Sequence, residues 1–145
     1  MTVETSALTL IRTKMQPPRL PADLVRRRRL VDRLQAGLDR KLTLISAQAG
    51  ACKTTLLAQW LNECPYPSAW LSLDEHDDDL IVIASYLTGA IRTEIPDACD
   101  KTLGLLGAAQ PPPLRVIATS LVNELNELTV VLSRNEDDST DPLKE

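Results

Sequence analysis

The sequence predicts an α/β domain whose mainly parallel sheet is flanked by helices. Short β-prone runs alternate with segments of helical period, and a loop of small residues joins the first run to a helix. Hydrophobic residues make up 43% of the chain and charged residues 25%, as in average globular proteins, which disfavours a disordered or collagen-like chain. A length of 145 residues suits one domain. We therefore expect a ligand at the carboxyl ends of the strands.

Residues 1–40 are predicted to form an N-terminal arm and a short helix. Three prolines and the lack of a sustained period indicate an extended arm over residues 1–23. The helix is indicated by apolar residues at helical spacing and ends near Gly37. These apolar residues are Leu30, Val31, Leu34 and Leu38.

Residues 41–133 are predicted to hold the α/β core, and the acidic residues 134–145 to form a disordered tail. Composition and period predict strands at 41–46, 68–73 and 129–133, and helices at 54–64, 80–91 and 114–128. Acidic residues between 74 and 79 suit the N-terminus of the second of these helices. Prolines bracket residues 96–113, which we expect to be a loop.

Charge and cysteine content exclude several classes of function. Residues 1–41 carry ten Lys or Arg against four acids, whereas the rest of the chain has a net charge of −10, so we expect no direct DNA binding. Three cysteines without CxxC spacing and a single histidine disfavour a disulfide framework and a zinc site, and suggest a reducing cytoplasm. No apolar run approaches the roughly 18 residues that a membrane span needs, so we expect no membrane partner.

The loop after the first predicted strand has the features of a phosphate-binding loop. Residues 47–54 read A-Q-A-G-A-C-K-T, which matches G-x-x-x-x-G-K-[ST] except that Ala47 and Cys52 occupy the two glycine positions. In such a loop, backbone N–H groups and the helix N-terminus surround the phosphates. Lys53 would reach the β- and γ-phosphates, and the Thr54 hydroxyl would bind Mg²⁺. The glycine before the lysine permits a backbone geometry that the Cβ of Cys52 hinders.

Three segments together resemble a known family. They are KMQPPRLPADLVRRRRLVDRL, KLTLISAQAGACKTTLLAQWL and AWLSLDEHDDDLIVIASYLTGAI. From about Leu10 to Leu132 the chain resembles the N-terminal nucleotide-binding domain of MalT-like, LuxR-type transcriptional regulators, which belong to the STAND class of P-loop NTPases. The resemblance implies that residues 41–133 form a partial P-loop NTPase domain. It also implies an ATP-driven switch in which ATP and an inducer promote self-association, after which a distant helix-turn-helix domain binds DNA.

The resemblance assigns residues to an ATP and Mg²⁺ site. The family's loop usually reads A-P-A-G-x-G-K-T-T, so an alanine at the first position is ordinary, whereas Gln48 and especially Cys52 are departures. The stretch L-V-x-R-x-R-L before the nucleotide adds Arg27 and, less directly, Arg29. The resulting nucleotide-binding candidates are Ala47, Gly50, Ala51, Cys52, Lys53, Thr54, Thr55 and Arg27, with Thr54 holding Mg²⁺ through the nucleotide.

The family's catalytic acids are missing at their usual place. They follow a later strand directly, whereas here the strand ending at Leu132 is followed by Ser133 and Arg134. Asp137 and Asp138 lie farther on, in the predicted tail, and are read as solvated residues rather than metal ligands. The chain also resembles only the first part of a larger regulator, without the strand that would lie between this strand and the phosphate-loop strand. We therefore expect weak or absent ATP hydrolysis.

Three hypotheses of function stay open at this stage. The preferred one is an ATP-binding domain fragment of a MalT-like regulator that associates with itself or with a longer regulator. The second is an interaction fragment or decayed gene product that binds no nucleotide, which Cys52 favours. The third and weakest is a small P-loop kinase, because its Arg-rich lid could use only Arg92, Arg115 and Arg134 downstream of the loop.

Overall fold

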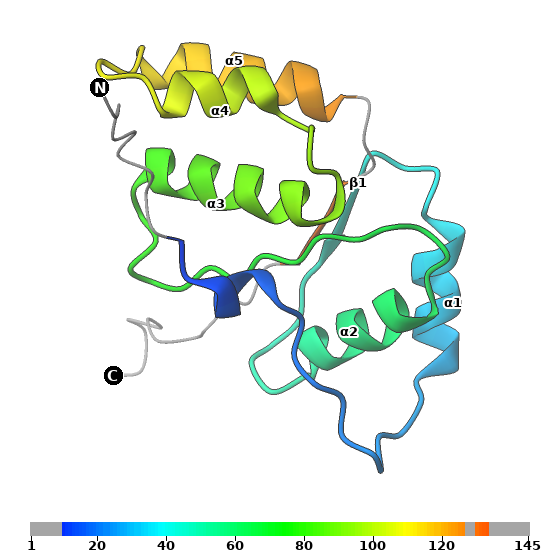
Figure 1. The fold of residues 1–145 in the computed structure, drawn as a ribbon. Coiled ribbons are helices and arrows are strands. Elements are labelled where there is room, and N and C mark those ends of the chain that lie inside the picture. The colour runs from blue at the N-terminus through cyan, green and yellow to red at the C-terminus, as the bar shows by residue number, and fades with distance from the viewer. Residues whose placement is uncertain (1–9, 127–129, 134–145) are drawn as a thin grey trace, which may run out of the picture. The chain divides into compact units, whose positions relative to one another are not determined.

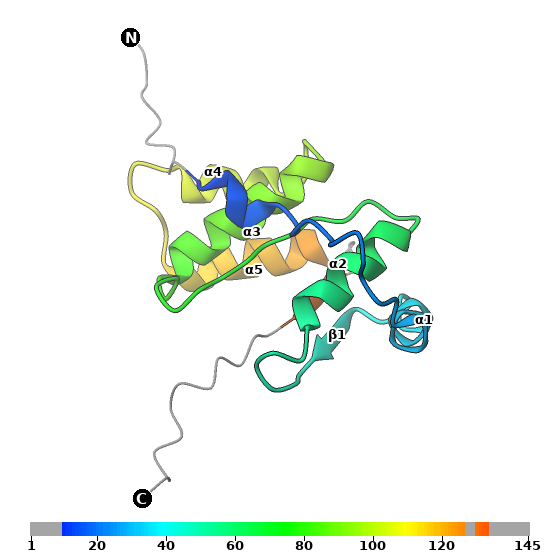
Figure 2. The same cartoon turned by 90° about the horizontal axis from the view of Figure 1, so that it is seen from below.

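The computed structural model describes residues 10–126 and 130–133, and these divide into two compact units. The helical unit takes its described residues from 10–17 and 66–126. The other unit takes them from 18–65 and 130–133, and we call it the phosphate-loop unit after the loop that the sequence predicts within it. Each unit is described by itself below. Figures 1 and 2 show the elements of both units along the chain. The predicted tail at 134–145 and the first nine residues of the arm lie outside the described residues.

The phosphate-loop unit contains the two described strands. Strand β1 (Leu42–Ile45) pairs in parallel with β2 (Val130–Ser133), in a register that sets Leu42 opposite Val130 and Ile45 opposite Ser133. Both strands were predicted from sequence and are confirmed. Parallel pairing brings the carboxyl end of β2 beside the residue from which the phosphate loop departs. The P-loop NTPase class of the fold stays a prediction.

Two helices complete this unit and were also predicted. Helix α1 (Arg28–Ala36) packs against α2 (Lys53–Glu63), and each buries its apolar face. Trp60 of α2 is 2% exposed and donates its indole N–H to Gln35 Oε1 of α1 at 3.2 Å. Gly37 ends α1 as its sequence position suggested. The buried apolar residues of the pair are Val31, Leu34, Leu56, Leu57, Ala58 and Trp60.

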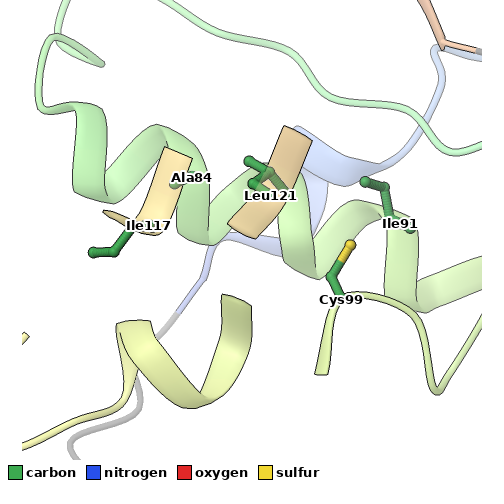
Figure 3. Close-up of a cluster of buried hydrophobic side chains, with 5 residues drawn as sticks. All are labelled: Ala84, Ile91, Cys99, Ile117 and Leu121. Carbon is green, nitrogen blue, oxygen red and sulfur yellow. The ribbon is translucent and has the colours of Figure 1, made fainter. Parts of the chain in front are cut away.

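The helical unit is built from α3 (Leu80–Glu94), α4 (Asp100–Leu106) and α5 (Leu114–Leu125), which lie side by side in Figure 1. Their core is small and aliphatic, apart from one thiol (Figure 3). The buried residues that form it are Ala84, Ile91, Cys99, Ile117 and Leu121. Helices α3 and α5 confirm the predicted helices.

The acidic cluster caps α3, as its position predicted. The Asp79 carboxylate accepts hydrogen bonds from the backbone N–H groups of Ile81 at 2.8 Å and Val82 at 3.4 Å. These bonds satisfy donors that have no partner within the helix. Two other acids of the cluster, Asp74 and Asp77, hold a different segment.

The N-terminal arm is docked on the helical unit by Lys14. Its ammonium lies 3.0 Å from an Asp74 oxygen and 2.5 Å from an Asp77 oxygen, and the hydrogen bonds from Lys14 lower the pKa of both carboxyls. A short 3₁₀ helix, η1 (Arg12–Met15), forms within the segment predicted to be an extended arm. The prediction was therefore wrong over these four residues, because contacts with α3 and its preceding loop organise them.

Two further predictions in this unit were wrong. Residues 68–73 form no strand, because neither of the two described strands pairs with them. The Ser72 N–H instead donates to the Lys14 carbonyl at 2.8 Å. Residues 96–113 are not a continuous loop, because they contain α4.

Helix α4 depends on a contact that local sequence cannot reveal. The Glu124 carboxylate on α5 accepts from the backbone N–H groups of Lys101 at 3.2 Å and Thr102 at 3.1 Å, and from the Thr102 hydroxyl at 2.5 Å. Burial would raise the pKa of Glu124, but these hydrogen bonds outweigh burial and lower it. A side chain 22 residues away in the sequence thus serves as the cap of this helix.

None of the helices in the described part of the chain is long and apolar enough to cross a membrane.

Candidate nucleotide site

The candidate site lies between β1 and α2, within the phosphate-loop unit. The strand ends at Ile45 and the helix begins at Lys53, so residues 46–52 form the connecting loop. The structure places all the sequence-predicted residues in this one unit. They are Ala47, Gly50, Ala51, Cys52, Lys53, Thr54, Thr55 and Arg27.

Lys53 turns its side chain back into the loop. The residue is only 6% exposed, and its ammonium donates to the Ala47 carbonyl and, at 3.2 Å, to the Gln48 carbonyl. A buried cation needs such partners because desolvation is costly. An anion entering the loop would compete with these two carbonyls for the ammonium, and charge-assisted bonds to phosphate are the stronger kind.

The N-terminus of α2 presents backbone donors to the loop. Cys52 is the N-cap residue, and its side chain makes no capping hydrogen bond. The first intrahelical bond runs from Leu56 N–H to the Cys52 carbonyl at 3.0 Å, so the N–H groups of the first turn have no partner within the helix. Together with the helix dipole, such donors favour an anion at this position.

The loop backbone requires left-handed geometry at two residues. Gly50 has φ +80°, which glycine adopts without steric cost. Cys52 has φ +57° and ψ +38°, and its thiol donates to the Gly50 carbonyl at 3.6 Å. A side chain at this conformation costs about 1–2 kcal/mol. The motif position that usually carries glycine therefore keeps its glycine-like backbone although a cysteine occupies it.

Arg27 reaches the loop from the segment before α1. Its guanidinium donates to the Ala51 carbonyl at 3.2 Å, and its backbone N–H donates to Gln59 Oε1 at 3.3 Å. The structure thus brings together Arg27 and the phosphate loop, as the resemblance implied. Arg29 is different: it is exposed on α1, and no hydrogen bond to the loop is among its described contacts.

An open hollow of about 360 Å³ adjoins these residues. Its walls come from the segment before α1 and from one face of α2. The lining residues are Pro21, Asp23, Leu24, Val25, Arg27, Cys52, Thr55, Leu56 and Gln59. The volume falls within the range of about 300–1,000 Å³ typical of small-molecule sites, and apolar walls with a few polar groups are their usual lining.

Sequence reasoning missed Gln59. The residue is 4% exposed, although glutamine is usually a surface residue. A signal existed in the spacing, because Cys52, Thr55, Leu56 and Gln59 recur at intervals of three and four and therefore share one face of α2.

Metal binding at this site would depend on the nucleotide. Among the residues that the structure describes, no three His, Cys, Asp or Glu side chains gather as a metal site. Thr54, the residue assigned to Mg²⁺ by the motif, is half-buried in the first turn of α2. Its hydroxyl could serve as one Mg²⁺ ligand, with the nucleotide phosphates supplying others. Asp137 and Asp138 lie outside the described residues.

Comparison with known proteins gives a consistent set of relatives, although no protein-family model matches the sequence. The serine/threonine-protein kinase PknK of Mycobacterium tuberculosis is 36% identical over 118 residues, which are 79% of this chain and 11% of PknK. The HTH-type transcriptional regulator MalT of Yersinia enterocolitica is 35% identical over 118 residues, which are 81% of this chain and 13% of MalT. MalT of Yersinia pestis is 35% identical over 117 residues.

The chain is related to a segment of MalT and of PknK. This relation supports the MalT-like resemblance found in the sequence. The chain spans little more than a tenth of the length of these relatives. The kinase and regulator activities in their names are therefore statements about those longer proteins.

Proposed function

We propose that this chain is the ATP-binding segment of a MalT-like, LuxR-type transcriptional regulator and acts as a nucleotide-dependent switch. The observation that carries the proposal is the loop after β1, where the Lys53 ammonium is buried among loop carbonyls at the N-terminus of α2. The relation to MalT supplies independent support. The partial P-loop NTPase fold, with its mainly parallel sheet and flanking helices, is part of this proposal.

Three residues in and beside the loop have distinct roles in this proposal. The triphosphate of ATP occupies the loop, where Lys53 exchanges its carbonyl partners for phosphate oxygens. The Thr54 hydroxyl binds the Mg²⁺ that accompanies the nucleotide. Arg27 holds the Ala51 carbonyl, and so fixes the loop against the segment before α1.

We expect binding rather than fast hydrolysis. Phosphoryl transfer to water needs a placed metal and an oriented water molecule, which carboxylates usually supply. Ser133, the last residue of β2, and Arg134 stand in the sequence where the family has its acid pair. The switch would then respond to the presence of ATP, and pass this state to a second copy or to a longer regulator in the cytoplasm.

The hypothesis of an interaction module that binds no nucleotide is favoured by one observation, which is the Cys52 side chain in the loop. Cys52 bears a Cβ and a thiol where the phosphate loop usually has only hydrogen atoms, and it lines the adjoining hollow. If this side chain blocks the phosphates, the segment serves as an interaction module without nucleotide. The two hypotheses differ in a single measurable property, which is affinity for Mg-ATP.

Thermal unfolding with and without Mg-ATP tests the proposal. ATP should raise the melting temperature of the wild-type protein, since a ligand that binds only the folded state stabilises it. Lys53→Ala should abolish this rise, whereas Lys101→Ala, the same change on the exposed start of α4, should retain it. Equal ATP-dependent shifts for wild type and Lys53→Ala would overturn the proposal, and so would the absence of any shift in the wild type.

A further inference from the structure

The positive charge of the chain is concentrated in the phosphate-loop unit. Residues 18–65 carry nine Lys or Arg against four acids, a net charge of +5. The described residues of the helical unit carry five Lys or Arg against nine acids, a net charge of −4. Because salt screens charges over about 10 Å, a charged partner responds to the local charge of a surface rather than to the net charge of the chain. The acids that argued against DNA binding lie almost entirely outside residues 18–65.

Five exposed arginines lie on α1 or within four residues of its ends, and we call them the arginine face. They are Arg26, Arg28, Arg29, Arg33 and Arg40. None of them forms an ion pair with a carboxylate among the residues that the structure describes. Helix α1 buries Val31 and Leu34 on its opposite side, and Arg29 and Arg33 share a side because they are four residues apart. The guanidinium groups are therefore available to a partner.

We propose that the arginine face binds the phosphate backbone of double-stranded DNA without reading its base sequence. The attraction is electrostatic, and it gains from the counterions that the duplex releases when arginines neutralise its phosphates. This surface is distinct from the candidate nucleotide site, since Lys53 is buried in the loop and the Arg27 guanidinium is bonded to the Ala51 carbonyl. The inference therefore does not depend on the proposed function.

The composition of the exposed side of α1 suits phosphates better than it suits a protein surface. None of the exposed large hydrophobic residues in the described part of the chain lies on α1. A protein interface usually has an apolar or aromatic centre within a polar rim. Guanidinium groups instead match phosphate oxygens through two parallel hydrogen bonds. An acidic protein would find charge on this surface but no apolar centre.

The unit also favours a duplex over a single strand. Proteins that bind single strands stack the bases on exposed aromatic side chains. Trp60 is the one aromatic residue between positions 18 and 65, and it is only 2% exposed. The nine residues of α1 span about 13 Å, over which a duplex carries about eight phosphate charges. Arginines spaced along this helix thus face a backbone whose charges are at least as closely spaced.

Fluorescence anisotropy of a labelled duplex of about 20 base pairs tests the proposal with the intact chain and no nucleotide. With about three to four phosphate contacts, the logarithm of the association constant should fall against the logarithm of salt concentration with a slope of about −3 to −4. A duplex of unrelated sequence should bind equally well. The double variant Arg28→Gln, Arg33→Gln should bind about ten- to hundredfold more weakly at about 100 mM salt, with a slope smaller by about 2.

Two matched variants separate the arginine face from the charge of the whole chain. Lys101→Gln with Arg115→Gln removes two positive charges from exposed positions of the helical unit, so its net charge equals that of the arginine variant. It should keep the wild-type affinity and slope. Arg28→Lys with Arg33→Lys keeps both charges and should keep the slope. The Gln variant at Arg28 and Arg33 should also retain any ATP-dependent rise in melting temperature, because neither residue belongs to the candidate nucleotide site.

Several results would overturn the inference and leave the proposed function untouched. They are no duplex binding by the wild type at about 50 mM salt, equal losses in the two charge-matched Gln variants, and loss of the slope in the Lys variant. Tighter binding of a labelled single strand of the same length would also overturn it. Tighter binding of a labelled oligoglutamate peptide would assign the arginine face to an acidic protein instead.

Discussion

Replacement of Cys52 by glycine should stabilise the protein, although it removes atoms from the structure. Cys52 has φ +57° and ψ +38°, a conformation that costs a residue with a Cβ about 1–2 kcal/mol. Glycine avoids this cost but loses about 0.5–1 kcal/mol through the greater freedom of its unfolded chain. The side chain is exposed, so little packing is lost. The difference lies between about 0 and 1.5 kcal/mol, so the expected net gain is about 0.75 kcal/mol, or roughly 2–3 °C in melting temperature.

The assay is thermal unfolding of the nucleotide-free protein, with two comparison variants. Cys52→Ala removes the thiol but keeps the Cβ and therefore the strain, so it should not give the same rise. Cys99→Gly changes the second cysteine with a left-handed backbone, at φ +58°. Cys99 is 4% exposed in the core of the helical unit, so its loss leaves a cavity whose cost should exceed the relieved strain.

Two results would refute this reasoning. A lower melting temperature for Cys52→Gly would mean that the backbone strain is smaller than the entropy cost of glycine. An equal rise for Cys52→Ala and Cys52→Gly would mean that the thiol, and not the Cβ at positive φ, is the source of the instability.

Three further predictions concern catalysis, pH and packing. The purified chain should show no ATP turnover above background, because Ser133 and Arg134 replace the acid pair; a robust rate in a phosphate-release assay would contradict this. Glu124→Gln should lower stability at pH 7 by about 1 kcal/mol. The Glu124 carboxylate has its pKa lowered from an ordinary value of 4.5, so its contribution is complete above that pH and is lost as the pH falls through the lowered value. Melting curves across this range should therefore fall more steeply for wild type than for Glu124→Gln, and parallel curves would contradict the capping role. Thr88→Val should raise stability by about 1 kcal/mol, because the Thr88 hydroxyl is fully buried and has no hydrogen-bond partner among the residues that the structure describes. A lower melting temperature, or a lower urea midpoint, for Thr88→Val would show that the hydroxyl has a partner.

The sequence predicted the elements whose causes are local. Helices α1, α2, α3 and α5 follow from apolar periodicity, and the Asp79 cap of α3 follows from its position before the helix. Helix α4 was missed because Glu124 caps it from another helix. Residues 68–73 were predicted as a strand from composition alone, but a strand also needs a partner, which is a property of the whole chain.

The residues of the candidate site could likewise be predicted from sequence only where their signal lies in a local motif or in the resemblance. The loop and Lys53 follow from a contiguous motif, and Arg27 from a longer resemblance. The spacing places Gln59 on one helix face with Cys52 and Thr55, but its burial and its hydrogen bond to Arg27, which lies 32 residues away, appear only in the structure.

The contacts of the loop also indicate where the cost of binding a phosphate lies. The backbone at Gly50 and Cys52 already has the left-handed geometry that the motif requires, and Arg27 already holds the Ala51 carbonyl. The group that must change partners is the Lys53 ammonium, which is bonded to two carbonyls. Charged phosphate oxygens are stronger acceptors than carbonyl oxygens, so Lys53 gains by exchanging the two carbonyls for a phosphate. This exchange requires that the Cys52 side chain leave room for the phosphate oxygens. Under the proposed function, phosphate binding therefore depends most directly on two adjacent residues, because Lys53 attracts the phosphates and Cys52 restricts the space for them.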